Sequence, residues 1–243
     1  ARLDQLEEEL DNLRTALGWA LTTDLEAELR LVSALMWFWH IHPRQLEGLD
    51  WVGKGLVQAQ TTGNPNGTPI NPIVWAKVLA AAGVMHTNEL QWISAKDKLE
   101  ESLGIYRELG ADGKAGVAFA LEWLGWNECI PGNYQHGVVL LQQALDLARE
   151  VKAPFPIGEC LFMLGIILNI IEPGSPEARQ CMNEALAVLS EIGDPDGIAT
   201  TYRFMGLMAF TARELEQAQF LFEQSLSLYQ QVGNKDAISG IYI

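Results

Sequence analysis

Four glycines recur at nearly equal spacing, and this repeat constrains the fold more than any other feature of the sequence. Gly83, Gly125, Gly165 and Gly206 lie 42, 40 and 41 residues apart. Twelve or thirteen residues after each glycine comes a second small residue, and a large apolar residue follows four positions later. The small residues are Ala95, Gly137, Ala178 and Ala218, and the large ones are Leu99, Leu141, Met182 and Phe222. Four copies of this frame in register predict four copies of one structural unit.

Each copy predicts two amphipathic α-helices, because its apolar residues recur at positions i, i+3, i+4 and i+7. The two small residues are expected where the backbones of both helices approach closely. First helices are predicted near residues 25–40, 72–88, 114–129, 156–171 and 196–211, and second helices near 46–60, 92–109, 134–151, 175–192 and 214–231. One pair cannot bury its apolar face alone, so the pairs should stack into an all-α, right-handed superhelical solenoid.

The repeat resembles the tetratricopeptide repeat. The shared pattern is a Leu-Gly pair in the first helix, followed in the second helix by Ala, a large apolar residue and an Ala-Leu or Ser-Leu pair, as at Ala144-Leu145 and Ser225-Leu226. The resemblance extends from Pro72 to the end of the sequence. The period of 40 to 42 residues is longer than the ~34 residues of the commonest form, which predicts longer helices or turns.

The whole chain is predicted to be a single solenoid domain. Residues 1–22 form a lead-in helix, 23–60 a degenerate first pair, 61–72 a turn-rich loop, 73–236 the four clear repeats, and 237–243 the start of a further first helix. The sequence begins without methionine and ends inside an apolar segment, so we interpret it as a fragment of a larger protein. An apolar end of this kind predicts either dimerisation through the last pair, with Leu221 and Leu228 exposed, or a frayed terminus.

The lead-in helix carries a second resemblance. Its segment Leu10-Asp11-Asn12-Leu13-Arg14, followed by Ala16-Leu17 and Trp19, is similar to a helix of bacterial STAND proteins. STAND proteins are signal-transduction ATPases with numerous domains and include large transcriptional regulators. In them this helix follows the ATPase and winged-helix modules and opens a C-terminal tetratricopeptide sensor. The resemblance implies a sensor arm that binds a partner or inducer and controls the ATPase.

Composition narrows the partners and the compartment. The formal net charge is −15, which disfavours nucleic acid and anionic membrane surfaces as partners. The sequence shows no signal peptide, and its longest apolar runs fall short of the ~20 residues that a membrane span needs. The three cysteines, Cys129, Cys160 and Cys181, are unclustered and fit free thiols in a reducing compartment. We therefore expect a cytoplasmic protein.

Catalytic and cofactor motifs are absent from the sequence. It contains no phosphate-binding glycine loop, dinucleotide-binding fingerprint, zinc-protease motif, nucleophile elbow or paired-cysteine motif. His40 and His42 would point to different faces of a helix, and no third metal ligand lies nearby. We expect no enzymatic activity, no metal and no cofactor. A helical-repeat hydrolase or transferase, the enzymatic alternative, would need a nucleophile–base pair that the sequence does not show.

The tetratricopeptide resemblance implies a ligand site in the concave groove, lined by the first helices. The family pattern places groove residues at −6, −3, +1, +4 and +5 from each repeat glycine. The candidates carried over in this way are Trp37, Lys77, Phe119, Glu122, Trp126, Glu159, Phe162, Ile166, Asn169, Arg203, Leu207 and Phe210. They form an apolar strip flanked by charges, which is typical of a binding surface. The alternatives are that these side chains pack between neighbouring pairs or that a tighter superhelix closes the groove.

The ligand class stays open at this level. A protein or peptide partner is expected, and a small-molecule inducer or a neighbouring domain also fits such a groove. Trp126 and Phe162 would be the anchors and Glu122 and Arg203 the orienting groups. The acidic excess favours a neutral or basic partner. A general peptide-binding scaffold outside STAND signalling is the alternative to the sensor role.

Overall fold

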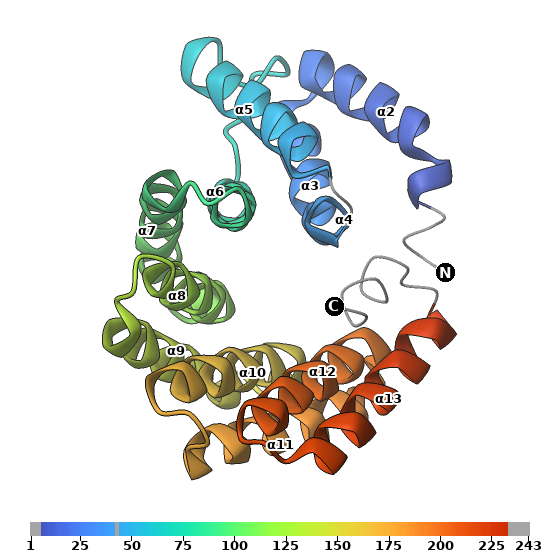
Figure 1. Ribbon diagram of the computed structural model, residues 1–243. Helices are drawn as coiled ribbons and strands as arrows, with labels where there is room; N and C mark the ends of the chain where they lie inside the picture. The colour runs from blue at the N-terminus through green and yellow to red at the C-terminus, as the bar shows by residue number, and fades with distance from the viewer. Residues whose placement is uncertain (1–5, 42–43, 233–243) are drawn as a thin grey trace. The chain divides into compact units, whose positions relative to one another are not determined.

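The computed structural model describes residues 6–41 and 44–232 (Figure 1). Its helices are α2 (Leu10–Thr23), α3 (Leu25–Ala34), α4 (Met36–Ile41), α5 (Gln45–Thr61), α6 (Pro72–Asn88), α7 (Trp92–Glu108), the 3₁₀ turn η1 (Gly110–Gly113), α8 (Lys114–Cys129), α9 (Tyr134–Glu150), α10 (Pro154–Ile171), α11 (Pro176–Ile192), α12 (Pro195–Thr211) and α13 (Leu215–Val232). No strand occurs within the described ranges. The all-α prediction is confirmed. The segment 237–243, predicted to start another helix, lies outside the described residues.

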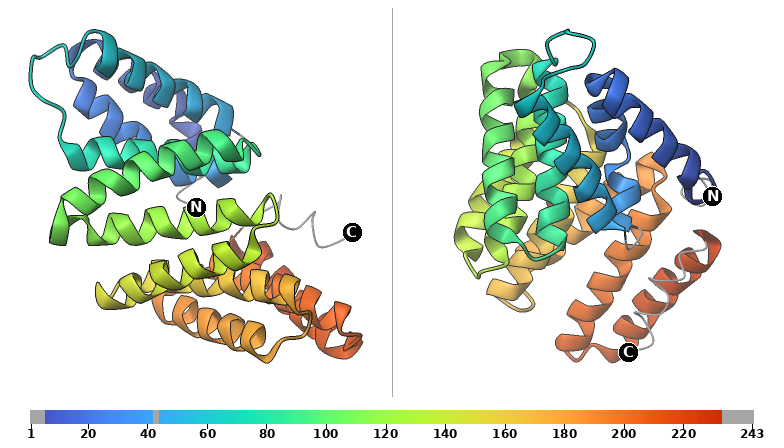
Figure 2. Two further views of the ribbon diagram at one scale, coloured as in Figure 1. Left: turned by 90° about the vertical axis from the view of Figure 1, so that its left-hand side faces the viewer. Right: turned by 90° about the horizontal axis from the view of Figure 1, so that it is seen from above.

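The chain folds as two compact units, and each is described by itself. Unit 1 is Ala1–Pro131 and contains α2 to α8, whereas unit 2 is Gly132–Ile243 and contains α9 to α13. In unit 1, α6 and α7 form an antiparallel pair, and in unit 2, α10 with α11 and α12 with α13 do the same (Figure 2). The predicted helix bounds for these pairs agree with the observed ones to within two residues.

The repeat glycines lie at the closest approach of the paired helices, as predicted. A Cβ atom on Gly83 of α6 would lie 2.5 Å from Cγ of Leu99 on α7. In unit 2, a Cβ on Gly165 would lie 2.9 Å from Cγ of Met182. Each partner is the large apolar residue of the same repeat copy. The repeat register read from the sequence is therefore the packing register of these pairs.

The buried serines of the repeat frame bind the partner helix. Ser102 of α7 donates a 2.8 Å hydrogen bond to the carbonyl of Ala76 on α6. Ser225 of α13 makes the same 2.8 Å bond to the carbonyl of Ala199 on α12. Both side chains are fully buried, so each bond satisfies a hydroxyl that has no access to water.

Replacing Ser102 with alanine is expected to lower the free energy of unfolding of unit 1 by about 1 kcal/mol, because the buried hydrogen bond is lost. All eight tryptophans lie between Trp19 and Trp126, so tryptophan fluorescence during denaturant unfolding reports unit 1 alone. Ser94→Ala, at an exposed position of α7, is the control. Equal losses in both variants would show that the Ser102 hydroxyl contributes nothing specific.

Helix starts and ends follow the proline and glycine signals of the sequence. The side chain of Asn71 accepts a 2.9 Å hydrogen bond from the backbone N–H of Ile73 and caps α6, with Pro72 in its first turn. Ser175 caps α11 in the same way, accepting from the N–H of Ala178 at 3.2 Å. Gly193 ends α11 at φ +70°, a conformation that favours glycine.

One predicted helix is wrong. The segment 25–40 was expected to be continuous, but it ends at Ala34 and restarts as α4 at Met36. Leu35 has φ −83° and ψ 3°, and its N–H is shared between the carbonyls of Leu31 and Ser33. The N–H of Leu35 donates to the carbonyl of Leu31 at 3.0 Å, and the ψ value near zero takes Leu35 out of the regular α-helical conformation. After the break, Phe38 and Trp39 are buried in unit 1.

The motif that resembles STAND proteins has a structural role in unit 1. Leu10 and Leu17 of α2 are buried, while Trp19 is exposed. The Arg14 guanidinium donates to both carboxylate oxygens of Glu47 on α5, at 2.6 and 2.9 Å. This pair fixes α2 against α5 and holds the pKa of Glu47 below its usual range.

We expected the longest apolar runs to be too short for a membrane span, and α10 is an exception. By length and composition alone, this helix is apolar enough to cross a membrane. In unit 2 it packs against α9, α11 and α12, and Cys160, Leu164 and Ile167 are buried there. Contacts with α9, α11 and α12 therefore cover part of the apolar surface of α10.

Candidate functional site

A cavity of about 770 Å³ opens on the first-helix side of unit 1. Its walls come from α3 and α4, from α6, from the C-terminal part of α7, and from η1 with α8. This volume lies within the range of small-molecule and peptide pockets. Unit 2 has a smaller cavity of about 100 Å³ between α11, α12 and α13, which no predicted site residue lines.

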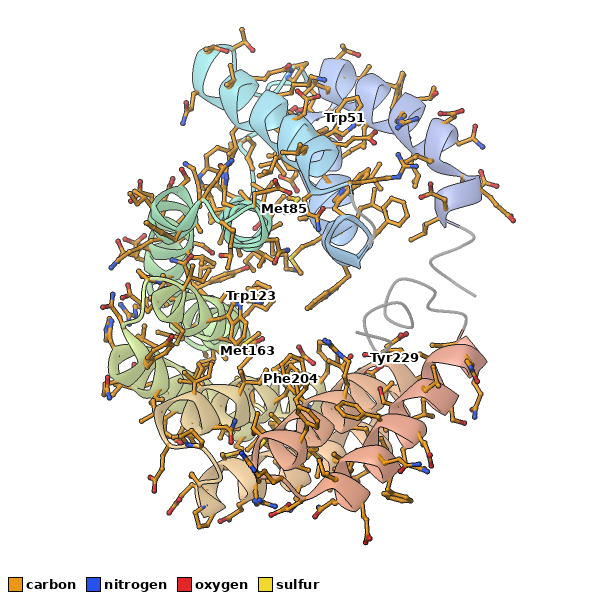
Figure 3. The ribbon with its side chains drawn as sticks, in the orientation of Figure 1. Trp51, Met85, Trp123, Met163, Phe204 and Tyr229 are labelled. Carbon is orange, nitrogen blue, oxygen red and sulfur yellow. The ribbon has the colours of Figure 1, made fainter. Side chains whose placement is uncertain are left out.

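Aromatic side chains form one wall of the cavity. Trp37 of α4 and Phe119 of α8 both line it, and the ring of each lies 6.4 Å from the ring of Trp123. Trp123, labelled in Figure 3, is itself buried. Rings at this separation stabilise one another, so Trp123 holds the two cavity-lining rings in place.

Small residues keep the cavity open. Ala34, Ala80, Ala115 and Gly116 line it, where larger side chains would fill the space. A Cβ atom on Gly116 would overlap the ring of Tyr106, which also contributes to the lining. Burial raises the pKa of Tyr106 to about 12.

Part of the polar rim is tied into the fold. Arg30 of α3 donates to the Glu26 carboxylate at 2.5 Å, and this carboxylate also accepts from the backbone N–H of Asn71 at 2.8 Å. The Asn71 N–H and then Arg30 hold the pKa of Glu26 below its usual value. This network braces α3 against the start of α6.

The remaining charges on the lining are Lys77 of α6 and Asp112 of η1. Both side chains are exposed. Within residues 6–41 and 44–232, neither forms an ion pair. The cavity thus combines an aromatic wall with the cations of Arg30 and Lys77 and the carboxylate of Asp112. Of these charges, only that of Arg30 is neutralised by a partner among the described residues.

The structure brings three predicted site residues together in unit 1. Trp37, Lys77 and Phe119 line the cavity. Glu122 and Trp126, on the same helix as Phe119, do not belong to its lining; Glu122 is 2% exposed and Trp126 is half-buried.

The cavity lies nearer to the helix N-termini than the family pattern places the groove. Sequence reasoning therefore missed Asn71, Val74, Asp112 and Gly116, which lie nine or more positions before the repeat glycines. Two of these could have been found from sequence signals. Asn71 precedes Pro72 at a helix start, and Asp112 lies in the predicted turn after the second helix.

In unit 2 the predicted residues form a partly packed surface on α10 and α12. Phe162 packs edge-on against Phe204, with ring centroids 5.2 Å apart, and the Arg203 guanidinium lies 4.8 Å above the Phe204 ring (Figure 3). Ile166 is buried, whereas Leu207 and Phe210 are 41% and 58% exposed. Packing between pairs thus explains part of the predicted strip, and the rest is open.

Two polar residues that were predicted to line the groove, Glu159 and Asn169, interact with nearby parts of unit 2. Burial, and secondarily the charge of Asp194, raise the pKa of Glu159 to about 7. Asn169 accepts a 3.1 Å hydrogen bond from the N–H of Gly174, which helps to close the loop between α10 and α11.

Groups suited to metal binding or nucleophilic chemistry are not gathered in the part of the chain that the structure describes. No three His, Cys, Asp or Glu side chains are placed there to hold a metal ion. Burial raises the pKa of the Cys129 thiol to about 11, which leaves it protonated and unreactive at neutral pH. The side chain of His40 and all of His42 lie outside the described residues.

Comparison with known proteins identifies the repeat and the fold. Residues 175–231, which include α11 to α13, match the tetratricopeptide repeat family. No curated protein matches the sequence.

Solved structures with a similar fold include NprR in complex with its cognate peptide NprX, which is 17% identical with a TM-score of 0.74 over 99% of this chain and 66% of NprR. Aspartyl phosphate phosphatase F from Bacillus subtilis is 14% identical, with a TM-score of 0.69 over 89% of this chain and 55% of the phosphatase. BtubC from P. vanneervenii is 13% identical, with a TM-score of 0.64 over 95% of this chain and 91% of BtubC. The chain therefore spans only about half of the phosphatase and about two thirds of NprR. At these identities the likeness shows a shared helical-repeat fold.

Proposed function

We propose that this chain is a non-enzymatic recognition module and that unit 1 binds a peptide or an extended protein segment in its cavity. The open cavity of about 770 Å³ with the aromatic wall of Trp37 and Phe119 carries this proposal. Aromatic side chains held rigidly at a partly enclosed surface supply large contact area at low entropic cost. The similar fold of NprR, which was solved with a bound peptide, supports a peptide as the ligand.

A catalytic function is the less favoured alternative. The similarity to aspartyl phosphate phosphatase F is limited to the fold at 14% identity. The cavity lining contains one carboxylate, Asp112, and no histidine or cysteine that could act with it as a nucleophile–base pair.

Trp37→Ala is expected to weaken peptide binding by about 2 kcal/mol, because Trp37 is an aromatic residue of the cavity wall and aromatic anchors carry much of the energy of binding. The probe is a peptide selected on the immobilised full chain from a phage-displayed library of random octapeptides. Its dissociation constant is measured by isothermal titration calorimetry for wild type, Trp37→Ala and the control Lys98→Ala on α7.

Trp126→Ala distinguishes binding in the cavity of unit 1 from binding at the groove position that the sequence predicted for Trp126. If the cavity is the site, Trp126→Ala should affect binding much less than Trp37→Ala. Selected peptides that bind wild type and Trp37→Ala equally, while both proteins melt at similar temperatures, would place recognition elsewhere.

At a finer level, we propose that the chain serves as the sensor arm of a cytoplasmic STAND-type ATPase regulator. The motif of α2 supports this, since Arg14 holds that helix against α5 at the start of the repeats. In this role, ligand binding would release or assemble the ATPase. A small-molecule inducer or a second copy of the chain are the other partners that fit this role.

The upstream sequence of the gene tests the sensor role directly. A phosphate-binding loop and a winged helix encoded before Ala1 are expected, together with ATP hydrolysis that changes when the selected peptide is added to the full-length protein. An upstream region without an ATPase would favour the general peptide-binding scaffold.

A further inference from the structure

The cavity of unit 1 is lined by charges of both signs, which come from different elements. Arg30 comes from α3 and Lys77 from α6, whereas Asp112 comes from η1, directly before α8. Within unit 1, α6 contacts both α3 and α8 and lies between them (Figure 1). The two cations therefore come from α3 and from the central helix α6, and the carboxylate comes from the turn that precedes α8. The apolar side chains of Trp37 and Phe119 complete the lining.

Internal partners in the part of the chain that the structure describes neutralise only one of these three charges. Arg30 is tied to Glu26, but Lys77 and Asp112 make no ion pair within the described ranges of the chain. Both side chains are exposed to water. Their charges are thus available to a ligand without breaking a contact of the folded protein.

Covering these charges with an uncharged ligand is unfavourable. A ligand that fills the cavity removes water from Lys77 and Asp112, and charges that lose water without gaining a partner weaken binding. A ligand that brings a carboxylate to Lys77 and a cation to Asp112 recovers this loss. Complementary charges also fix the orientation in which a ligand binds.

We infer that the cavity selects a peptide segment with an acidic group at Arg30 and Lys77, a basic group at Asp112 and an apolar side chain on Trp37 and Phe119. This inference rests on the proposed peptide-binding function and adds the charge pattern and direction of the ligand. It refines the expectation of a neutral or basic partner, because a segment with one acidic and one basic group has no net charge.

Selection from the random octapeptide library tests the charge pattern. The full chain is immobilised as wild type, as Lys77→Met, as Asp112→Asn and as Ala115→Trp, which fills the cavity from an exposed position of its lining. Ser94→Trp, exposed on α7, is the matched control for an added tryptophan. Circular dichroism melting establishes that each variant is folded.

Wild type and Ser94→Trp are expected to enrich peptides that carry both an acidic and a basic residue around an apolar one. Lys77→Met should lose the enrichment of acidic residues, and Asp112→Asn that of basic residues. For one selected peptide, changing its acidic residue to the amide should weaken binding to wild type about 10-fold and to Lys77→Met less than twofold.

The two proposals fail in different ways. In one outcome, wild type selects peptides that Ala115→Trp does not select, but these peptides show no charge pattern. Peptide binding in the cavity would then stand, and the charge assignment would be overturned. Identical selections on wild type and Ala115→Trp would overturn peptide binding in the cavity and this inference with it.

Discussion

Gly83→Leu is expected to lower the free energy of unfolding of unit 1 by about 3 kcal/mol, the upper end of the range for overpacking. The added side chain would point at Leu99, whose Cγ lies 2.5 Å from the position of a Cβ on Gly83. The carbonyl oxygen of Ala95 lies 3.3 Å from the same position, so the backbone of α7 would also have to move. Denaturant unfolding followed by tryptophan fluorescence measures the loss in unit 1.

Gly104→Leu is the matched control for this prediction. Gly104 lies on α7, and no neighbouring atom lies within 4 Å of the position of its Cβ. This substitution should leave stability unchanged or raise it slightly, because glycine is a poor helix former. An unchanged denaturant midpoint for Gly83→Leu would show that the repeat register is wrong. Gly165→Leu repeats the test in unit 2, with circular dichroism as the readout.

The helix pairs could be predicted because each pair needs a residue without a side chain where its two helices approach most closely. Each repeat glycine with a described environment faces the large apolar residue of its own copy, as Gly206 faces Phe222. A requirement of this kind appears in the sequence at a fixed spacing. The break at Leu35 could not be predicted in the same way. The residues on either side of it keep a helical pattern of apolar side chains, and Phe38 and Trp39 beyond it are buried in unit 1, so helical periodicity does not mark the break.

The candidate site could be predicted only in part, because a cavity is defined by what neighbouring elements leave unfilled. Trp37, Lys77 and Phe119 were predicted since they occupy family positions on first helices. Asp112 comes from a turn, and Gly116 contributes by lacking a side chain beside Tyr106. Neither contribution follows from the pattern of one helix. Both depend on how α7, η1 and α8 pack together.

Glu28→Gln is expected to stabilise unit 1 by about 3 kcal/mol at pH 7 to 8 and by much less at pH 5. Glu28 of α3 is 0% exposed, and neither of its carboxyl oxygens has a hydrogen-bond partner among the described residues. Its Oε2 lies 2.5 Å from the position of a Cβ on Gly55 of α5, so the carboxyl group is enclosed where α3 and α5 meet. Burial raises its pKa from 4.5 to about 8.

The direction of the pH effect follows from proton linkage. The folded state keeps its proton on Glu28 up to about pH 8, whereas the unfolded state releases this proton above about pH 4.5. Between these values the unfolded state binds fewer protons, so raising the pH favours unfolding. The contribution of Glu28 to stability therefore falls from about pH 5 to pH 8 and is constant above that. A neutral glutamine removes this dependence.

Chemical denaturation of unit 1 at pH 5, 7 and 8, followed by tryptophan fluorescence, measures the effect. Glu100→Gln, at an exposed position of α7, should differ from wild type by less than about 0.5 kcal/mol throughout. Net destabilisation by Glu28→Gln at pH 8 would mean that the folded protein holds an ionised Glu28 with a satisfied carboxylate. A gain that grows with pH would instead show that unit 1 keeps a buried, protonated carboxyl group at some expense of stability. Since this group lies on α3, the helix that also carries Arg30 to the cavity, the same titrations with bound peptide report whether its protonation is coupled to ligand binding.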